Sequence, residues 1–322
     1  MSRVDVHAHF VPDVYREALA AAGIDRPDGI AGVPAWSAEE ALATMESLDV
    51  ERSYLSISSP GVHLGDDAAA RTLARECNEA AAALARRHPG RFGWFASLPL
   101  PDVDAAVVEA GHALTTLGAD GIVLETHTAG VYLGDPSLEP VYALAAARRV
   151  PVFVHPTTPW EAEHLALGYP RPMLEFLFDT TRSIAQLVLS GVLERHEDLR
   201  VIVPHAGAAL PILANRIELL LPILSAPGQA PPSSMREALR RLHFDLAGAP
   251  VPELLGTLLA VADPDRVHYG SDYPFTPPDA CVRLAEALDA TDLLAGDLRA
   301  KVDRGNAEAL FARAAETAAV AS

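Results

Sequence analysis

Short apolar runs alternate with longer stretches rich in Ala and Leu along the whole chain. The apolar runs that we interpret as strands span residues 4–8, 53–58, 91–97, 120–125, 151–155, 199–204, 242–245 and 267–271. Runs such as VIVP and PVFVH have no alternation of apolar and polar positions, which is typical of strands buried on both faces of a parallel sheet. The stretches between them, for example 67–87 and 102–117, predict helices.

A strand followed by a helix, repeated along the chain, predicts a parallel sheet, because parallel neighbours need a crossover connection. Such crossovers are right-handed, so eight successive units close into a (β/α)8 TIM barrel. An open, doubly wound sheet is the alternative, and it would gather its site at a single switch point. The 322 residues contain no low-complexity linker and no internal repeat beyond this alternation, so we expect one α/β barrel domain over residues 1–322.

Side chains suited to metal binding end three of the predicted strands. They are His7 and His9 in VDVHAHF, His155 in VPVFVHP and Asp272 in HYGSDYP. Side chains alternate faces along a strand, so His7 and His9 point in the same direction. A barrel brings the C-terminal ends of all its strands to one face, where these four residues can meet. Imidazole and carboxylate ligands suit a divalent transition metal.

Three histidines and one aspartate leave a coordination position open, which indicates a catalytic metal rather than a structural one. The set suits zinc, with manganese as the alternative. His205, in LRVIVPHAG, ends the sixth predicted strand and is not needed as a ligand. We therefore expect it to act as an acid or base beside the open position. Among the histidines of the loops at this face, His127 follows its strand most closely and is a candidate substrate contact.

The formal net charge of −18 argues against nucleic acid or an anionic membrane as a partner. The same negative field opposes an anionic substrate, so we expect a local cation near the site. Cys77 and Cys281 are too few for a disulfide framework. Metal-type residues begin at position 7, and no apolar run approaches the ~18 residues that span a bilayer. We expect neither a signal peptide nor a spanning helix, and hence a cytoplasmic protein.

Four motifs resemble the metal-dependent amidohydrolase superfamily, in the branch that holds decarboxylases of aminocarboxymuconate semialdehyde and of hydroxybenzoates. VDVHAHFVP is similar to its HxHxxP motif, and HP at 155–156, PHAGAALP at 204–211 and GSDYP at 270–274 are similar to its later blocks, in the same order. The stretches LSISSPGVHLG and GVYLGDP look like the subgroup of 6-methylsalicylate decarboxylases. One departure is His127, where that subgroup often has Asn.

The resemblance implies a role for each matching residue. His7, His9, His155 and Asp272 correspond to the metal ligands of the branch, and His205 corresponds to its catalytic histidine. Arg216 matches an arginine that contacts a substrate carboxylate, in some members across a dimer interface. That guanidinium would supply the local cation that the acidic chain needs. The resemblance also implies a homodimer or a dimer of dimers.

The function implied is metal-dependent, non-oxidative decarboxylation of a small ortho-hydroxybenzoate such as 6-methylsalicylate. Asp272 would donate a proton to the ring carbon that carries the carboxylate, and His205 would assist. Trp160 and Phe275 are candidates for stacking on the ring, with ordinary loop packing as the alternative. A second hypothesis is hydrolysis of an amide, lactone or carbon–carbon bond in a small carboxylated substrate by the same residues. A third is a binding protein that has kept the fold and lost activity.

Overall fold

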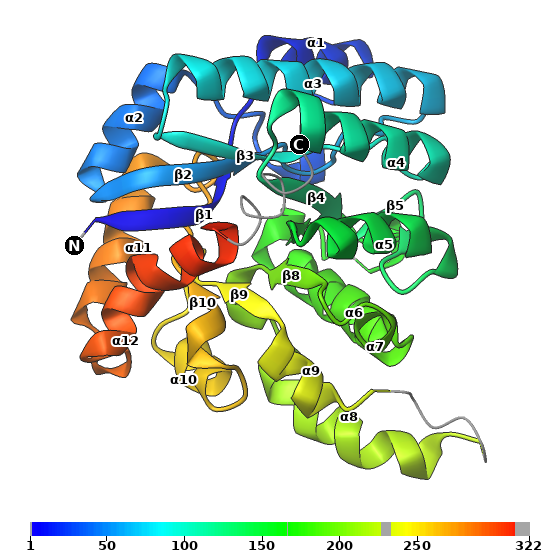
Figure 1. Cartoon of the computed structure of the whole chain (residues 1–322), viewed down its shortest axis with the longest axis vertical. Coiled ribbons are helices and arrows are strands. Elements are labelled where there is room, and N and C mark those ends of the chain that lie inside the picture. Colours follow the sequence, from blue (N-terminus) through cyan, green and yellow to red (C-terminus); the bar gives the residue numbers. More distant parts are fainter. Residues whose placement is uncertain (1, 166, 227–232, 313–322) are drawn as a thin grey trace.

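Eight parallel strands form the centre of the molecule. The computed structural model describes residues 2–165, 167–226 and 233–312. The strand order in the sheet is β1-β2-β3-β4-β7-β8-β9-β10 (Figure 1). The strands are β1 (Arg3–His9), β2 (Val50–Ser56), β3 (Phe92–Ala96), β4 (Gly121–Glu125), β7 (Pro151–His155), β8 (Arg200–Val203), β9 (His243–Asp245) and β10 (Val267–His268).

Backbone hydrogen bonds join the last strand segment to the first. Val6 N donates to Tyr269 O at 3.0 Å, and Asp272 N donates to His7 O at 2.7 Å. The sheet therefore curls into the predicted (β/α)8 barrel, and the open-sheet alternative is wrong. All eight predicted strands are present. The last is shorter than predicted, because the chain leaves regular strand geometry before Asp272, whose φ is +59°.

A short hairpin that the sequence reading missed follows β4. Strands β5 (His127–Thr128) and β6 (Val131–Tyr132) pair antiparallel, with His127 opposite Tyr132. The two residues between them, Ala129 and Gly130, both have positive φ, as a tight two-residue turn requires. The signal was present as Ala-Gly between His127-Thr128 and Val131-Tyr132, but two-residue strands lie below the length that periodicity detects.

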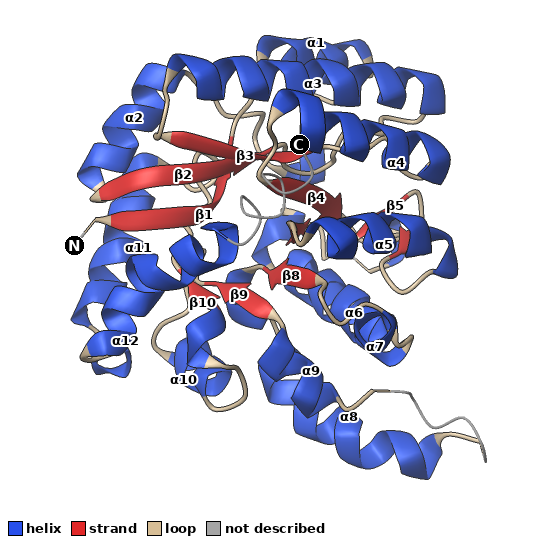
Figure 2. Cartoon of the chain, viewed as in Figure 1, coloured by secondary structure: helices blue, strands red, loops and turns tan. Residues whose placement is uncertain are grey.

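Helices surround the barrel, as Figure 2 shows by the blue ring around the red strands. They are α1 (Asp13–Ala21), α2 (Ala38–Ser47), α3 (Asp67–Arg87), α4 (Val103–His112), α5 (Glu139–Arg148), α6 (Glu175–Leu189), α7 (Val192–Arg195), α8 (Leu210–Leu224), α9 (Met235–Arg241), α10 (Glu253–Leu259), α11 (Pro278–Ala290) and α12 (Asp297–Ala300). Side-chain N-caps start several of them: Asp66 accepts from Ala69 N at the start of α3, and Asp102 from Ala105 N at the start of α4.

The barrel interior is a packed core. Phe95 of β3 and Phe153 of β7 stack with ring centroids 5.2 Å apart, and Phe311 stacks on Tyr54 of β2. Phe153 also meets the ring of His7 edge-on at 4.8 Å. The ring of His7, a predicted metal ligand, therefore packs against this aromatic core, which limits the movement of His7.

Helix α8 leaves the body of the molecule, at the lower right of Figure 1. By length and composition alone the segment His205–Leu224 is apolar enough to cross a membrane, a property that it shares with core helices of soluble proteins. Arg216 and Glu218 interrupt its middle, where charges are costly in hydrocarbon. The cytoplasmic location stays a prediction.

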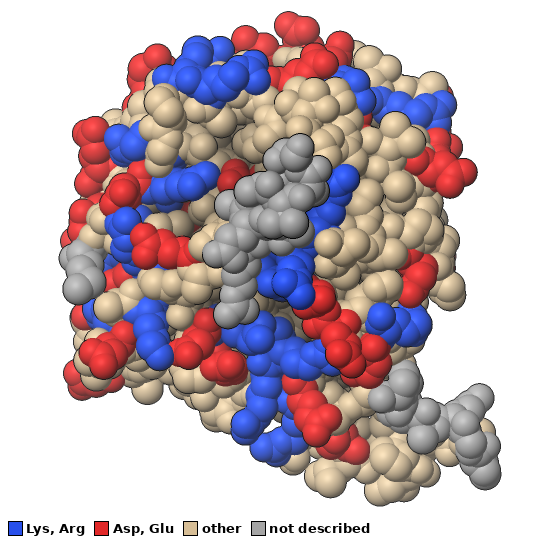
Figure 3. Space-filling view, in the orientation of Figure 1, with Lys and Arg blue, Asp and Glu red and all other residues tan. Residues whose placement is uncertain are grey.

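Acidic and basic side chains lie intermixed on the face shown in Figure 3. Lys301 contacts Asp265 at 2.6 Å, and Arg304 pairs with both Glu51 and Glu308. Such exposed pairs contribute little to stability, at most about 1 kcal/mol each. On this face the acidic side chains are therefore interspersed with basic ones.

Candidate metal centre and active site

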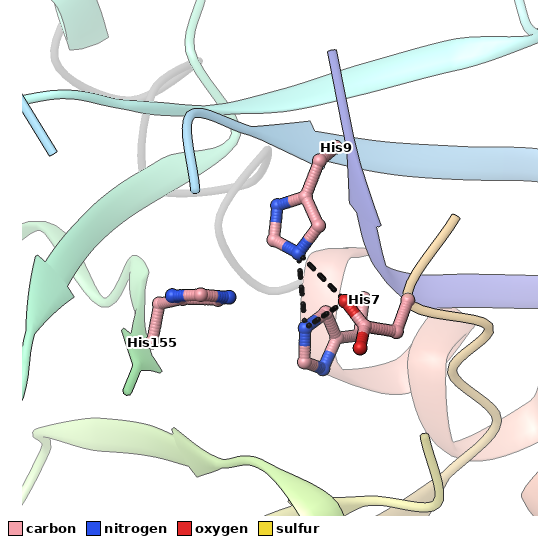
Figure 4. A group of neighbouring side chains, drawn as sticks. His7, His9 and His155 are labelled. Carbon is pink, nitrogen blue, oxygen red and sulfur yellow. Dashed lines mark hydrogen bonds and ion pairs between the residues drawn. The ribbon is translucent and has the colours of Figure 1, made fainter. Parts of the chain in front are cut away.

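Four side chains from distant parts of the chain converge at the C-terminal mouth of the barrel. The ligand-type atoms of His7, His9, His155 and Asp272 all lie within 4.8 Å of one another. His7 Nε2 is 3.2 Å from His9 Nε2, and Asp272 Oδ1 is 3.1 Å from His9 Nε2. Figure 4 shows His7 and His9 projecting from β1 and His155 from β7 toward one point. The structure thus brings together the four residues that the sequence singled out as ligands.

Two of the three histidines are held through the other ring nitrogen. His7 Nδ1 lies 2.9 Å from Asp245 Oδ2, and His9 Nδ1 lies 2.9 Å from Ser56 Oγ. Such contacts fix the orientation and tautomer of metal-binding histidines. His155 Nδ1 approaches Glu125 Oε2 at 3.4 Å, but neither of these buried atoms forms a hydrogen bond with a described residue. Sequence reasoning missed Ser56, Glu125 and Asp245. A signal existed, because they are the last residues of β2, β4 and β9.

The donor set fits a cation. The charge of His7 holds the pKa of Asp245 below its usual range despite burial, so this carboxylate accepts and His7 Nδ1 donates. His9 Nδ1 also lies 3.3 Å from the carbonyl oxygen of Ser56, which can only accept. In their neutral forms both rings therefore turn a lone pair on Nε2 toward each other and toward Asp272. Acceptors arranged in this way repel one another unless a cation or a proton lies between them.

Burial and charge set the protonation of the cluster. Burial lowers the pKa of His155 well below its usual value, and the neighbouring His9 and His7 lower it further. Burial also lowers the pKa of His7, but the charges of Asp245 and Asp272 outweigh it and raise the pKa to about 9. Burial opposes the ionisation of Asp272, yet hydrogen bonds to His205 and His9 hold its pKa well below the usual range. Asp272 is therefore ionised, as a predicted ligand of a cation should be.

The backbone at the site is held in uncommon conformations. Asp272 has φ +59° and His205 has φ +55°, values that cost a non-glycine residue energy and recur at functional sites. The buried Asp5 organises this region, because its two carboxylate oxygens accept from His7 N, Ser271 N and Ser271 Oγ. Gly270 is required here, since a Cβ atom would lie 2.9 Å from His7 Cβ.

His205 stands beside the cluster without joining it. It follows β8, and its Nε2 lies 3.7 Å from Asp272 Oδ2. Its backbone N donates to Asp245 Oδ1 at 3.1 Å, so Asp245 positions both His7 and His205. Within the described part of the chain, His205 Nδ1 is buried without a hydrogen-bond partner. This geometry is the one expected of an acid–base group outside the ligand set.

A cavity of about 630 Å³ opens above the cluster. His155, His205 and Asp272 form its polar end. Most of the remaining wall is apolar: Ile30, Pro34, Pro172, Met173, Phe176, Leu177, Leu254, Pro274 and Phe275. The size and lining suit a small aromatic ligand with one charged end. Phe275, a predicted ring contact, lies in this wall, with its ring centroid 5.5 Å from that of His9.

Three other predicted substrate contacts lie away from this cavity in the described structure. His127 Nε2 bonds to Thr158 O at 2.9 Å, because the hairpin turns the ring toward that loop. Trp160 packs edge-on against His127 and is 54% exposed. Arg216 is exposed on α8 and forms no hydrogen bond or ion pair with the described residues. None of the three lines the cavity, so a substrate role for them stays a prediction.

Comparisons with known proteins show the family of the chain. The family model described as Amidohydrolase matches residues 4–313. The 6-methylsalicylic acid decarboxylase of Penicillium expansum is 36% identical over 317 residues, which are 97% of each chain. The crystal structure of an amidohydrolase II superposes with a TM-score of 0.91 at 35% identity, covering 97% of this chain and 100% of that one.

A further solved structure has a similar fold. It is the 5-carboxyvanillate decarboxylase of Novosphingobium aromaticivorans, complexed with manganese and a hydroxy-methoxy-nitrobenzoic acid. The TM-score is 0.85 at 23% identity, covering 97% of this chain and 96% of that one. The resemblance drawn from the motifs is confirmed by the family model and by the Penicillium relative. The chain therefore belongs to the amidohydrolase family, in the branch that contains the 6-methylsalicylic acid decarboxylases.

Proposed function

We propose that this protein is a carbon–carbon lyase that decarboxylates a small 2-hydroxybenzoate similar to 6-methylsalicylate. The observation that carries the proposal is the combination of the ligand cluster with a non-ligand acid–base residue, His205, at one end of an apolar cavity. Relatives named as decarboxylases of 6-methylsalicylic acid and of gamma-resorcylate support it.

His7, His9, His155 and Asp272 would hold one divalent ion, which we propose to be zinc. When bound, the ion supplies Lewis acidity and orients the adjacent phenolate and carboxylate oxygens of the substrate. Manganese is the alternative, because the similarly folded 5-carboxyvanillate decarboxylase is complexed with manganese. Elemental analysis of the purified protein distinguishes the two metals.

The protein's own side chains then transfer one proton to the substrate. His205 passes a proton through Asp272 Oδ2, which lies 3.7 Å from its Nε2, to the ring carbon that carries the carboxylate. The bond between this carbon and the carboxylate breaks, CO2 leaves, and the electron pair of that bond restores the aromatic ring. The apolar wall around Phe275 keeps water from the protonated ring.

The test of the proposal is a substrate panel given to the metal-loaded protein. We expect CO2 from 2-hydroxybenzoates, above all from 6-methylsalicylate, and no cleavage of esters, lactones or amides of similar size. Cleavage of the second group without CO2 from the first would contradict the proposal and favour a hydrolase that uses the same residues.

We further propose that the chain acts as a homodimer through α8. Ile212, Leu219, Ile223 and Leu224 on this helix are between 60% and 75% exposed, an apolar face that a second copy would cover. Arg216 lies on the same helix, where it has no partner among the described residues. In the dimer it would reach the partner's cavity and bind the substrate carboxylate.

A further inference from the structure

One carboxylate in the cavity wall takes no part in the chemistry above. Asp28 lies in the long loop between α1 and α2, in the single turn Pro27–Gly29. It lines the same cavity as His155, His205 and Asp272. Its backbone is in the left-handed region, with φ +55°, a conformation that Asp tolerates at a small cost. The surrounding wall is mostly apolar, so a carboxylate here is costly unless its oxygens have partners.

One oxygen of Asp28 is firmly anchored. Its Oδ1 accepts hydrogen bonds from Ser59 Oγ at 3.0 Å, from Thr158 N at 3.2 Å and from Thr158 Oγ1 at 2.5 Å. Ser59 follows Ser58, whose Oγ lies 3.4 Å from His155 Nε2. The loops after β2 and β7 thus hold Asp28 in the cavity wall, and its position does not depend on its own loop alone.

The other oxygen of Asp28 is free to accept. Among the described residues no donor forms a hydrogen bond with its Oδ2. Burial raises the pKa of Asp28, while the hydrogen bonds from Thr158 and Ser59 and the charge of Arg171 oppose this shift. A carboxylate oxygen in the cavity wall that accepts no hydrogen bond favours a ligand that brings a donor, because binding would bury this oxygen, and it disfavours an analogue that lacks one.

We propose that Asp28 determines substrate specificity by accepting a hydrogen bond from a second hydroxyl group on the substrate ring. The inference rests on the proposed decarboxylase function. The carboxylate and the ortho hydroxyl of the substrate face the metal centre, so the ring edge at positions 4 and 5 faces the remaining wall. Repulsion between Asp28 and the substrate carboxylate enforces this orientation. A 2-hydroxybenzoate with a further hydroxyl group meta or para to the carboxylate should therefore be preferred over the same ring without that group.

The test compares 2-hydroxybenzoate with 2,4- and 2,5-dihydroxybenzoate on the metal-loaded protein. We expect kcat/KM for one of the dihydroxy compounds to exceed that for 2-hydroxybenzoate by about tenfold or more. In Asp28→Asn the amide oxygen can still accept from Ser59 and Thr158, but an NH2 donor replaces the free acceptor. The ratio should therefore fall by about tenfold or more. Asp25→Asn, at an exposed aspartate of the same loop, should keep the ratio.

Isothermal titration calorimetry of the same compounds gives a second readout that does not require turnover. The unmodified protein should bind a dihydroxy compound more tightly than 2-hydroxybenzoate, and Asp28→Asn should lose this preference. A ratio unchanged in Asp28→Asn, or an equal loss toward all compounds, would assign Asp28 a purely structural role and overturn the inference. The binding preference without any release of CO2 would support the inference and contradict the proposed decarboxylation instead.

Discussion

In the proposed mechanism His205 and Asp272 would share the proton transfer, with His205 outside the cluster of predicted ligands and Asp272 within it. Their side chains approach to 3.7 Å, but only Asp272 lies among the atoms that converge on one point. Removal of each should therefore have a different effect on metal content. This difference separates an acid–base role from a ligand role, which a loss of activity alone cannot do.

We predict that His205→Ala keeps the metal and lowers kcat by about 10²–10⁴-fold, the usual contribution of a positioned acid or base. Asp272→Asn should lose both turnover and metal affinity, because it removes a ligand charge. Metal content by elemental analysis and CO2 release are measured on both variants. His164→Ala, at a side chain that is 73% exposed, is the control and should match the unmodified protein. Loss of the ion from His205→Ala would mean that His205 is a ligand.

Metal affinity should depend on pH through His7. Its pKa is raised to about 9, so below pH 9 the metal must displace a proton from this ring. Affinity should rise with pH up to about 9 and then level, and binding at pH 7 should release about one proton. Calorimetry of metal binding in buffers of different ionisation enthalpy measures that number. Asp245→Asn removes the charge that raises this pKa most, so it should release fewer protons. No proton release from the unmodified protein would contradict this account.

The sequence predicted the residues that converge at the mouth of the barrel better than the residues that line the cavity. His7, His9, His155 and Asp272 could be found because barrel topology alone brings strand ends together. The positions of His127 and Trp160 depend on a hairpin and on loop packing that no periodicity reports. Glu125 and Asp245 could also have been predicted from the sequence, because each is the last residue of its strand.

At the scale of elements, the geometry of the site depends on the junction between β1 and the segment that follows β10. His7 lies in β1, and Asp272 lies in that segment. A Cβ atom at Gly270 would meet His7 Cβ at 2.9 Å and Asp245 Cβ at 3.3 Å. The helices and strands themselves were predictable from apolar runs and Ala-rich stretches. The irregular segment after β10 was not predictable. The positive φ of Asp272 depends on contacts with β1, such as the hydrogen bond from Asp272 N to His7 O, rather than on local sequence.

We predict that Gly270→Ala destabilises the fold by about 1–3 kcal/mol, since a methyl group is forced into a packed junction. It should also weaken metal binding by displacing His7. Denaturant unfolding and metal titration measure the two effects. Gly256→Ala in α10 is the matched control, because its Cβ meets only Leu293 at 3.7 Å and a helical position favours Ala by about 1 kcal/mol. Equal stability of the two variants would contradict the proposed tight junction.

At the scale of the whole molecule, one chain provides the cluster of predicted metal ligands and the cavity, but no arginine is among the described residues that line this cavity. The sequence predicted that an acidic protein needs a local cation for an anionic substrate. Arg216 meets this need only if the exposed apolar face of α8 brings it to a second chain. Because Arg216 lies away from the described cavity of its own chain, we expect it to contribute to the cavity of a second chain, so that each site is formed by two chains.

We predict that Arg216→Ala lowers kcat/KM while it leaves the fold and the metal content unchanged. Mixed with inactive His205→Ala, it should regain partial activity, because in a mixed dimer one site carries both substitutions and the other carries neither. Turnover is followed after subunit exchange, which mass spectrometry verifies. Exchange without recovered activity would show that Arg216 does not act across an interface.

The central claim is that a proton replaces the carboxylate on the ring carbon. The most direct measurement is turnover of 6-methylsalicylate and of the dihydroxybenzoates in D2O, with the product analysed by NMR and the gas by mass spectrometry. The account predicts one CO2 per product and one deuterium at the carbon that carried the carboxylate. Product without CO2, or deuterium absent from that carbon, would contradict it.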